Sequence, residues 1–166
     1  MLKVAILMGS DSDAEVMKQA WEVLAEFGVE ADVRVLSAHR TPDETVAFAK
    51  SAKENDIGVI IAAAGGAAHL AGVIAAVTSV PVIGVPIMSK STSGLDSLLS
   101  MVQMPKGIPV ATVAIDGAKN AGLLALRILA VSDEEIYKKY EQFRLDQSSE
   151  VKQKDQKLRQ KLGLES

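Results

Sequence analysis

The sequence predicts an α/β protein with a doubly wound, parallel sheet of five strands, three layers and flavodoxin-like topology. Five short apolar runs are rich in Val and Ile, segments with helical spacing lie between them, and strand and helix alternate throughout. Such alternation requires right-handed crossovers that place helices on both faces of a parallel sheet. An extra helix is expected at the C-terminus.

The predicted strands cover residues 2–8, 31–36, 57–64, 80–86 and 109–115. Each run has the length of a strand, and its apolar character is continuous rather than alternating. Continuous runs are typical of strands buried on both faces. We therefore expect all five strands to be buried.

Two helices are indicated between the first three strands. Asp11 or Ser12 can cap the first helix, and Gly28 can end it. Pro42 stands in the first turn of the second helix, where its missing amide hydrogen is tolerated. The helical spacing of three and four residues runs through Val16, Ala20, Val23, Leu24 and Phe27 in the first helix and Val46, Ala49 and Ala52 in the second.

Residues 131–166 have a different character, with a capped start at 132–135 followed by a segment rich in Lys, Glu and Gln. On the pattern alone, this helix is either a solvated tail or an extension that packs on a neighbouring subunit. We predict one domain over 1–166, with an α/β core at 1–130 and an intersubunit extension at 131–166. The stripe that would make the contact is Ile136, Tyr140, Phe143, Gln147, Val151, Lys154, Leu158 and Leu162.

Composition excludes several classes of function. The net charge of −3 offers no broad cationic surface for nucleic acid. The absence of cysteine removes disulfides, thiolate metal sites and cysteine nucleophiles. No run has the length of a secretory signal or a membrane span, so we expect a cytoplasmic protein without membrane contact.

The loops that follow the first four strands have the composition of a binding site. Residues 9–13, 37–42, 64–69 and 88–94 are built largely of Gly, Ser and Thr and contain both histidines, whereas the opposite edge has ordinary turns such as 54–56. Ligands of open parallel sheets bind outside the carboxyl ends of the strands. Small residues before a helix expose amide groups that suit phosphate or carboxylate, so Gly9-Ser10, Gly65-Gly66 and 91–94 are candidate anion sites.

Four charged or titratable residues in these loops are candidates for chemistry. Asp13 is either a second helix cap or a ligand of ribose hydroxyls, and Arg40 is either a surface cation or a forked donor to phosphate. Without cysteine, a metal-ligand cluster, a nucleophile elbow or a phosphate-binding Walker loop, histidine acid/base chemistry is favoured. His39 is the main candidate, and His69 is either a rival or only a cap of its helix.

Four runs together closely resemble the 5-(carboxyamino)imidazole ribonucleotide mutase family of purine (IMP) biosynthesis. They are GSDSD at 9–13, SAHRTP at 37–42, AGGAAHL at 64–70 and DSLLSMVQMPKGIPVATVAI at 96–115. The resemblance implies a flavodoxin-like homo-octamer with sites between subunits. It also implies a small nucleotide substrate and no metal or organic cofactor.

The resemblance also implies roles for individual residues. Ser37 and His39 match the catalytic loop. The substrate-binding residues implied or predicted on this rim are Gly9, Ser10, Asp13, Arg40, Gly65, Gly66, Ala67, His69, Leu70 and Ser89, of which 65–67, His69 and Leu70 match the segment that wraps the carboxyl group.

In the reaction that the resemblance implies, a carbamate on the exocyclic amine loses carbon dioxide, which stays trapped until a ring carbon captures it. His39 would protonate the departing amine and then remove the proton from the ring carbon. Two alternatives stay open: a carboxylase of the same fold that uses free carbon dioxide, and a nucleotide-binding or signalling module without enzyme activity. A phosphate-accepting aspartate in the third strand would favour the module, and residues 57–64 contain none.

Overall fold

The computed structural model describes residues 2–164 and contains one five-stranded sheet with the order β2-β1-β3-β4-β5. Every neighbouring pair of strands is parallel, which confirms the predicted fold class. The strands are β1 (Lys3–Met8), β2 (Ala31–Val35), β3 (Ile57–Gly65), β4 (Val82–Ile87) and β5 (Ala111–Thr112).

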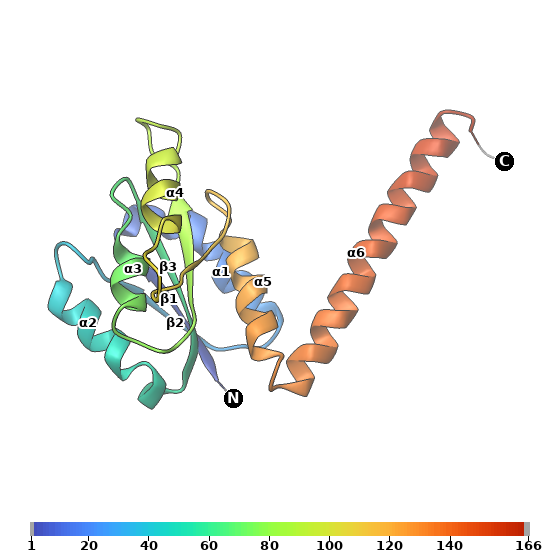
Figure 1. Cartoon of the computed structure of the whole chain (residues 1–166). Helices are drawn as coiled ribbons and strands as arrows, with labels where there is room; N and C mark the ends of the chain where they lie inside the picture. The colour runs from blue at the N-terminus through green and yellow to red at the C-terminus, as the bar shows by residue number, and fades with distance from the viewer. Residues whose placement is uncertain (1, 165–166) are drawn as a thin grey trace.

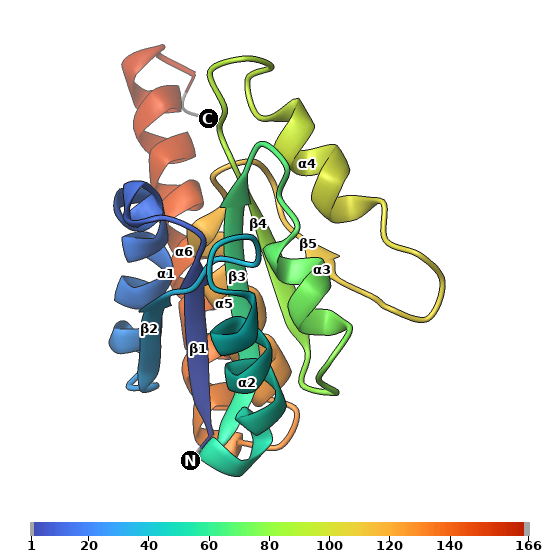
Figure 2. The same ribbon diagram turned by 90° about the vertical axis from the view of Figure 1, so that its left-hand side faces the viewer.

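Helices cover both faces of the sheet (Figures 1 and 2). One face packs against α1 (Ala14–Glu26) and α5 (Ala118–Leu129), and the other against α2 (Pro42–Ser51), α3 (Leu70–Ala75) and α4 (Leu95–Val102). Short 3-10 turns, η1 (Asp11–Asp13) and η2 (Lys53–Asn55), precede α1 and follow α2.

The central strands separate two apolar cores. In β3, Val59 and Ile61 face the α1 and α5 side, whereas Ile60 and Ala62 face the α2 and α3 side, and all four are fully buried. Strand side chains alternate between faces, so a continuous apolar run fills both cores at once. This rigid centre fixes the positions of the loops at the carboxyl ends of the strands.

The expectation that all five strands are buried is wrong for both edge strands, since β5 has no buried residue and β2 is largely exposed. Val33 is 45% exposed and Val35 54% exposed. β2 lies at the edge of the sheet and pairs only with β1. An apolar edge strand therefore leaves part of its surface uncovered in a single chain.

The predicted fifth strand is also much shorter in the structure. Pairing with β4 involves only Ala111 and Thr112. Pro109 before them has no amide hydrogen to donate to a ladder. After them, the Gly117 amide donates to the Ala114 carbonyl at 2.9 Å and closes a tight turn.

The predicted cap of the first helix is wrong as well. Neither Asp11 nor Ser12 caps α1; instead, the Ser10 hydroxyl accepts from the Ser12 amide at 3.3 Å and caps η1. The end of α1 agrees with prediction, since Gly28 follows it with φ of +77°. The start of α2 at Pro42 is also confirmed.

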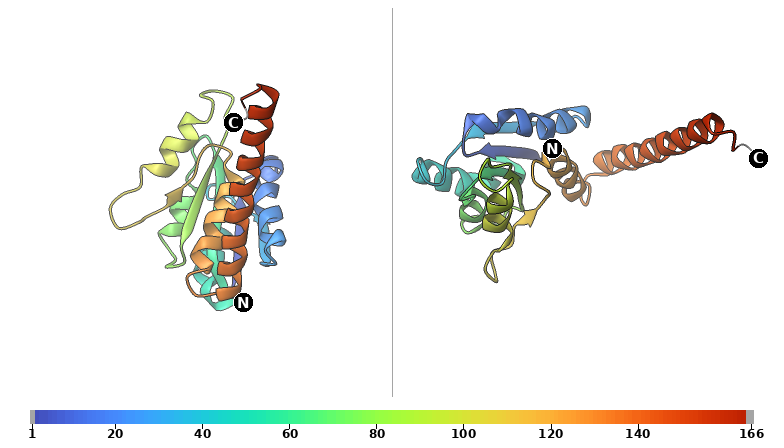
Figure 3. Two further views of the ribbon diagram at one scale, coloured as in Figure 1. Left: turned by 90° about the vertical axis from the view of Figure 1, so that its right-hand side faces the viewer. Right: turned by 90° about the horizontal axis from the view of Figure 1, so that it is seen from above.

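The long helix α6 (Glu134–Lys161) projects away from the α/β body (Figures 1 and 3). Its start is capped by Asp133, whose carboxylate accepts from two amides. Tyr140 and Phe143 pack on Phe27 near the base of the helix, whereas Val151 and Leu158 are 64% and 55% exposed. Within the described residues, the base of α6 is therefore packed against the α/β body, whereas apolar side chains in its distal half are exposed to solvent. The predicted contact with another subunit stays a prediction, and residues 165–166 of the predicted extension lie outside the described residues.

Candidate functional site

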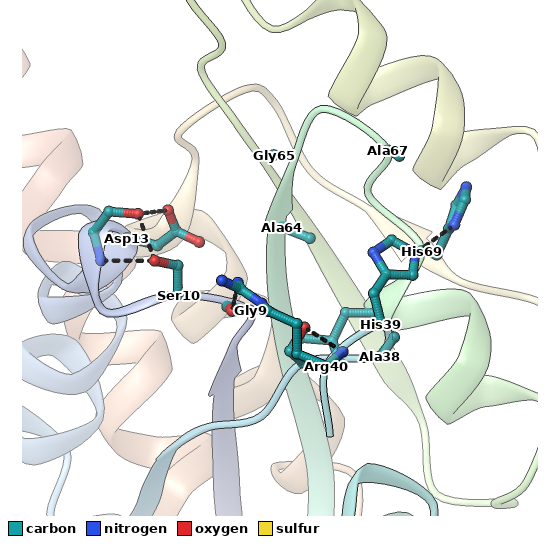
Figure 4. Close-up of a pocket in the computed structure, with 13 residues that line it drawn as sticks. Gly9, Ser10, Asp13, Ala38, His39, Arg40, Ala64, Gly65, Ala67 and His69 are labelled. Carbon is teal, nitrogen blue, oxygen red and sulfur yellow. Dashed lines mark hydrogen bonds between the residues drawn. The ribbon is translucent and has the colours of Figure 1, made fainter. Parts of the chain in front are cut away.

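A cavity of about 220 Å³ opens at the carboxyl ends of β1, β2 and β3 (Figure 4). Its position agrees with the rule that ligands of open parallel sheets bind at this edge. Eleven of the twelve predicted site residues come from the three loops concerned, and ten of them line the cavity: Gly9, Ser10, Asp13, Ser37, His39, Arg40, Gly65, Ala67, His69 and Leu70.

The loop after β1 forms a small polar cluster on one side of the cavity. The Ser12 hydroxyl lies 3.0 Å from the Ser10 hydroxyl and 3.1 Å from a carboxylate oxygen of Asp13. Gly9 leads into this cluster, and its amide donates to the Ala63 carbonyl at 3.1 Å. The strand register therefore places this cluster directly beside the end of β3.

Asp13 is only 7% exposed, although it lies beside an open cavity. Burial raises the pKa of its carboxyl above the ordinary value of 3.8; the hydrogen bond from Ser12 opposes this shift, and the charges of Asp116 and Asp11 add to it. Its side chain makes no helix-capping hydrogen bond. Asp13 therefore does not act as a second helix cap. Its role as a ligand of ribose hydroxyls stays a prediction.

The SAHRTP run forms a tight turn between β2 and α2. The Thr41 amide donates to the Ser37 carbonyl at 2.9 Å, and the Ser37 amide donates to the Thr41 hydroxyl at 2.9 Å. The Arg40 amide donates to the Ser37 hydroxyl at 3.2 Å. Two hydroxyl side chains thus hold the turn that presents residues 38–40 to the cavity.

The Arg40 side chain extends toward Gly9 in the first loop (Figure 4). One terminal nitrogen of its guanidinium donates to the Gly9 carbonyl at 2.8 Å. This bond orients the guanidinium and leaves further N–H donors for a ligand, because an arginine carries five. An oriented guanidinium beside Ser10 can bind an anionic oxygen group.

The two histidines face each other on the other side of the cavity (Figure 4). Nε2 of His39 lies 2.9 Å from Nδ1 of His69, and the two rings are nearly perpendicular at 87°. A hydrogen bond needs one N–H and one lone pair, so the two facing nitrogens carry one proton between them. His69 occupies the position before α3, but its side chain makes no cap.

The loop after β3 forms the third wall of the cavity. Gly66 has φ of +65°, a conformation that favours glycine. It turns the chain so that Ala67 and His69 reach the cavity. The small residues at 64–67 leave space beside the histidine pair for a small group.

Two predicted substrate-binding residues do not line this cavity. Gly66 forms the turn just behind it, and Ser89 lies in the loop between β4 and α4. The Ser89 hydroxyl donates to Asp96 at 2.7 Å and accepts from the Gly94 amide at 3.2 Å. Its hydrogen bonds thus hold the loop that contains it, and its role as a substrate contact stays a prediction.

The structure adds residues that were not predicted for the site. Ser12, Ala38 and Ala64 line the cavity, and their place inside the quoted motifs was the signal that could have found them. Ser97 is fully buried and bonds to Gly66. A buried serine inside an apolar helix has no distinctive spacing in the sequence.

Within residues 2–164, no group of three or more side chains is arranged to hold a metal ion. The same residues contain no helix that is both long enough and apolar enough to cross a membrane. The cytoplasmic location stays a prediction.

A parallel sheet with a cavity at its carboxyl edge, an oriented arginine and a histidine pair defines an α/β protein whose cavity can take a small molecule beside groups that are able to transfer a proton. The sequence profile of the family described as "AIR carboxylase" matches residues 3–150. The chain belongs to this family.

Relatives and solved structures agree with this assignment. The chain is 59% identical to the N5-carboxyaminoimidazole ribonucleotide mutase of Pyrococcus horikoshii, over 93% of this chain and 88% of that one. It is 54% identical to the protein of the same name from Thermotoga maritima, over 96% and 94% of the two chains. The crystal structure of Treponema denticola PurE superposes with a TM-score of 0.88 at 31% identity and covers 95% of this chain and 99% of that one.

Proposed function

We propose that this protein is an N5-carboxyaminoimidazole ribonucleotide mutase, an isomerase that produces the 5-amino-4-carboxyimidazole ribonucleotide of purine biosynthesis. The observation that carries the proposal is the cavity itself, where an oriented Arg40 faces one side and the His39 and His69 pair the other. The names of relatives with more than half of their residues identical supply the substrate.

The nucleotide would lie along the first two loops. Ser10 and the free donors of Arg40 would bind its phosphate, and Asp13 would accept hydrogen bonds from the ribose hydroxyls. A carboxylate that is already largely desolvated costs less to cover with a sugar than a fully hydrated one does. Charge-assisted hydrogen bonds to the phosphate would then fix the base near the histidines.

The chemistry would occur beside His39. The bond between the exocyclic nitrogen and the carbamate carbon breaks, carbon dioxide forms, and His39 donates a proton to the amine nitrogen. The ring carbon then attacks carbon dioxide, the new carbon–carbon bond forms, and His39 takes back the proton that this carbon loses. No net proton is consumed, so one histidine suffices for both transfers. Ser37 would hold the turn that carries His39.

The third loop would hold the carbon dioxide. Gly65, Ala67 and Leu70 offer small or apolar surface, which suits a neutral gas that no charged group can bind tightly. Such an intermediate is retained only where the site is closed to solvent. His39 and His69 are exposed in the single chain, so a neighbouring subunit would have to complete the closure.

We also propose that the protein is a homo-oligomer, with the octamer as the expected state. The bare surface of β2 and the distal stripe of α6 support the proposal, because uncovered apolar surface of this extent favours association. Light scattering after size-exclusion chromatography measures the mass directly. A monomeric mass at micromolar concentration would contradict it.

A carboxylase that uses free carbon dioxide is the second candidate. The chain is 51% identical to the chloroplastic phosphoribosylaminoimidazole carboxylase of Vigna aconitifolia over 98% of this chain, although it covers only 29% of that protein. The test follows formation of the carbon-carboxylated nucleotide from two starting materials: the carbamate nucleotide, and the uncarboxylated nucleotide with bicarbonate. We expect rapid conversion of the carbamate alone. Efficient use of bicarbonate would make it a carboxylase, and no turnover of either would favour a binding module.

A further inference from the structure

Helix α4 holds Gly66 by both of its peptide groups. The Gly66 amide donates to the Ser97 hydroxyl at 2.8 Å, and the Ser100 hydroxyl donates to the Gly66 carbonyl at 3.1 Å. The Ser97 hydroxyl in turn donates to the Ile87 carbonyl at 2.7 Å. One fully buried hydroxyl therefore joins the turn after β3 to the end of β4.

The path from this turn to the histidine pair is short and stiff. After Gly66, the Ala68 amide donates back to the Gly66 carbonyl at 2.9 Å, and the His69 amide donates to the Ala67 carbonyl at 2.9 Å. Consecutive turns of this kind leave little freedom between Gly66 and His69. A displacement of Gly66 would thus move both the cavity wall at Ala67 and the imidazole that faces His39.

We infer that Ser97 is a positioning residue that fixes the loop after β3 as the wall of the carbon dioxide pocket. This inference rests on the proposed function, because it assigns the wall a role in keeping the freed gas beside the ring carbon. Ser97 touches no substrate; it acts through Gly66. Without its hydroxyl, the Gly66 amide and the Ile87 carbonyl lose their partner in a buried place, which is costly unless the loop moves to find water.

Loss of the Ser97 hydroxyl should let carbon dioxide escape from the pocket, which we call a leak, rather than lower the rate of every step equally. When the wall is loose, carbon dioxide escapes before recapture, and the uncarboxylated nucleotide is released in place of the carboxylated product. A variant that is merely less stable lowers the amount of active enzyme, but it does not change the ratio of the two products. That ratio is therefore the informative quantity.

The experiment starts from the carbamate nucleotide with a labelled carboxyl carbon and measures the fraction of label lost to solution per turnover. We expect Ser97→Ala to raise that fraction at least about fivefold, the equilibrium change produced when the Gly66 amide alone loses one hydrogen bond of ordinary strength. Ser100→Ala should leak less, because the Ala68 amide still bonds to the Gly66 carbonyl. Ser51→Ala is the matched control, since Ser51 bonds to a backbone carbonyl in α2, away from the cavity.

A second variant reaches the same turn without touching α4. A Cβ added at Gly66 meets nothing within 4 Å, but φ of +65° strains any other residue there. Gly66→Ala should therefore leak as Ser97→Ala does, and Gly66→Asn should leak less, because asparagine tolerates this conformation better. An unchanged product ratio in both Ser97→Ala and Gly66→Ala would overturn the inference.

Hydrogen exchange separates this inference from the proposed function. We expect the Gly66 amide to be protected in the unaltered protein and to exchange at least about fivefold faster in Ser97→Ala, for the same reason. An unaltered protein that does not convert the carbamate defeats the proposed function, and unchanged exchange in Ser97→Ala defeats the positioning role.

Discussion

The loops after β1 and β4 have similar compositions and lie at the same edge of the sheet, but their polar side chains make different hydrogen bonds. In the loop after β1, Asp13 receives one serine hydrogen bond, lies beside the cavity, and has a pKa raised by burial. In the loop after β4, hydrogen bonds from Ser89, Thr92, Ser91 and the Ser97 amide lower the pKa of Asp96 to about 2. Both loops are short and rich in serine, and Asp13 and Asp96 each lie at the start of the following helix.

We interpret the loop after β1 as one that binds a ligand. The loop after β4 instead uses its polar groups to stabilise its own conformation, and we call it the self-satisfied loop. Around Asp96 the donors are used within the loop, so little hydrogen-bonding capacity remains for a ligand. Around Asp13 the carboxylate accepts one hydrogen bond, from Ser12, and burial raises its pKa; a carboxyl with a shifted pKa beside a cavity is typical of functional sites. Composition predicts that both loops lie on the binding edge, but only geometry tells them apart.

The largest effect should come from His39 in the cavity. His39→Asn removes proton transfer but no phosphate contact, so turnover should fall by about 10²- to 10⁴-fold. Nucleotide affinity, measured by calorimetry, should stay nearly unchanged. Near-normal turnover would show that His39 is not the acid/base group, and a parallel loss of affinity would show that it binds the nucleotide instead.

The next effect concerns Arg40, the cation that the first loop orients. Arg40→Ala should raise KM for the nucleotide about 10- to 100-fold, the loss expected for hydrogen bonds to a charged group. Arg144→Ala is the matched control, because Arg144 is an exposed cation on α6 that pairs with Glu141. Equal KM values for the two variants would remove Arg40 from the nucleotide site.

Asp96 offers a pH test of the self-satisfied loop. Its folded pKa of about 2 lies below the ordinary 3.8, so its contribution to stability is present above pH 3.8 and is lost as the pH falls through 2. Asp96→Asn lacks that contribution. The difference in urea midpoint between the two proteins should be largest near neutral pH and shrink toward pH 2; a constant difference would contradict the assignment.

The sequence predicted the fold and the sheet edge well because both depend on patterns repeated over many residues. Continuous apolar runs, separated by segments with helical spacing, predicted the strands of the sheet. The spacing of three and four residues predicted α1. What failed depends on neighbours in space: the exposure of β2 follows from its edge position, and the brevity of β5 from the turn at Ala114. The histidine pair joins residues thirty positions apart, and no local pattern encodes that contact.

Asp13 should show the opposite sign to Asp96. Its folded pKa is raised, so the protein holds this proton more tightly when folded, and stability falls as the pH rises through the range above 3.8. Asp13→Asn should therefore raise the urea midpoint at neutral pH while weakening nucleotide binding. Asp155→Asn, at an exposed position of α6, is the control. A variant that is both less stable and normal in binding would make Asp13 an ordinary structural residue.

The smallest functional effect should come from Ser89, the predicted substrate contact that lies in the self-satisfied loop. Its hydroxyl already donates to Asp96 and accepts from the Gly94 amide, so Ser89→Ala should lower stability by about 1 kcal/mol, the usual worth of such a bond. Nucleotide affinity should change less than about twofold, since a change below 0.5 kcal/mol is expected where no contact is lost. Calorimetry of the variant decides between the two roles. A tenfold loss of affinity at unchanged stability would show that Ser89 contacts the nucleotide. The Ser89 hydroxyl would then exchange its bond to Asp96 for one to the ligand, and part of the β4–α4 loop would lie beside the nucleotide.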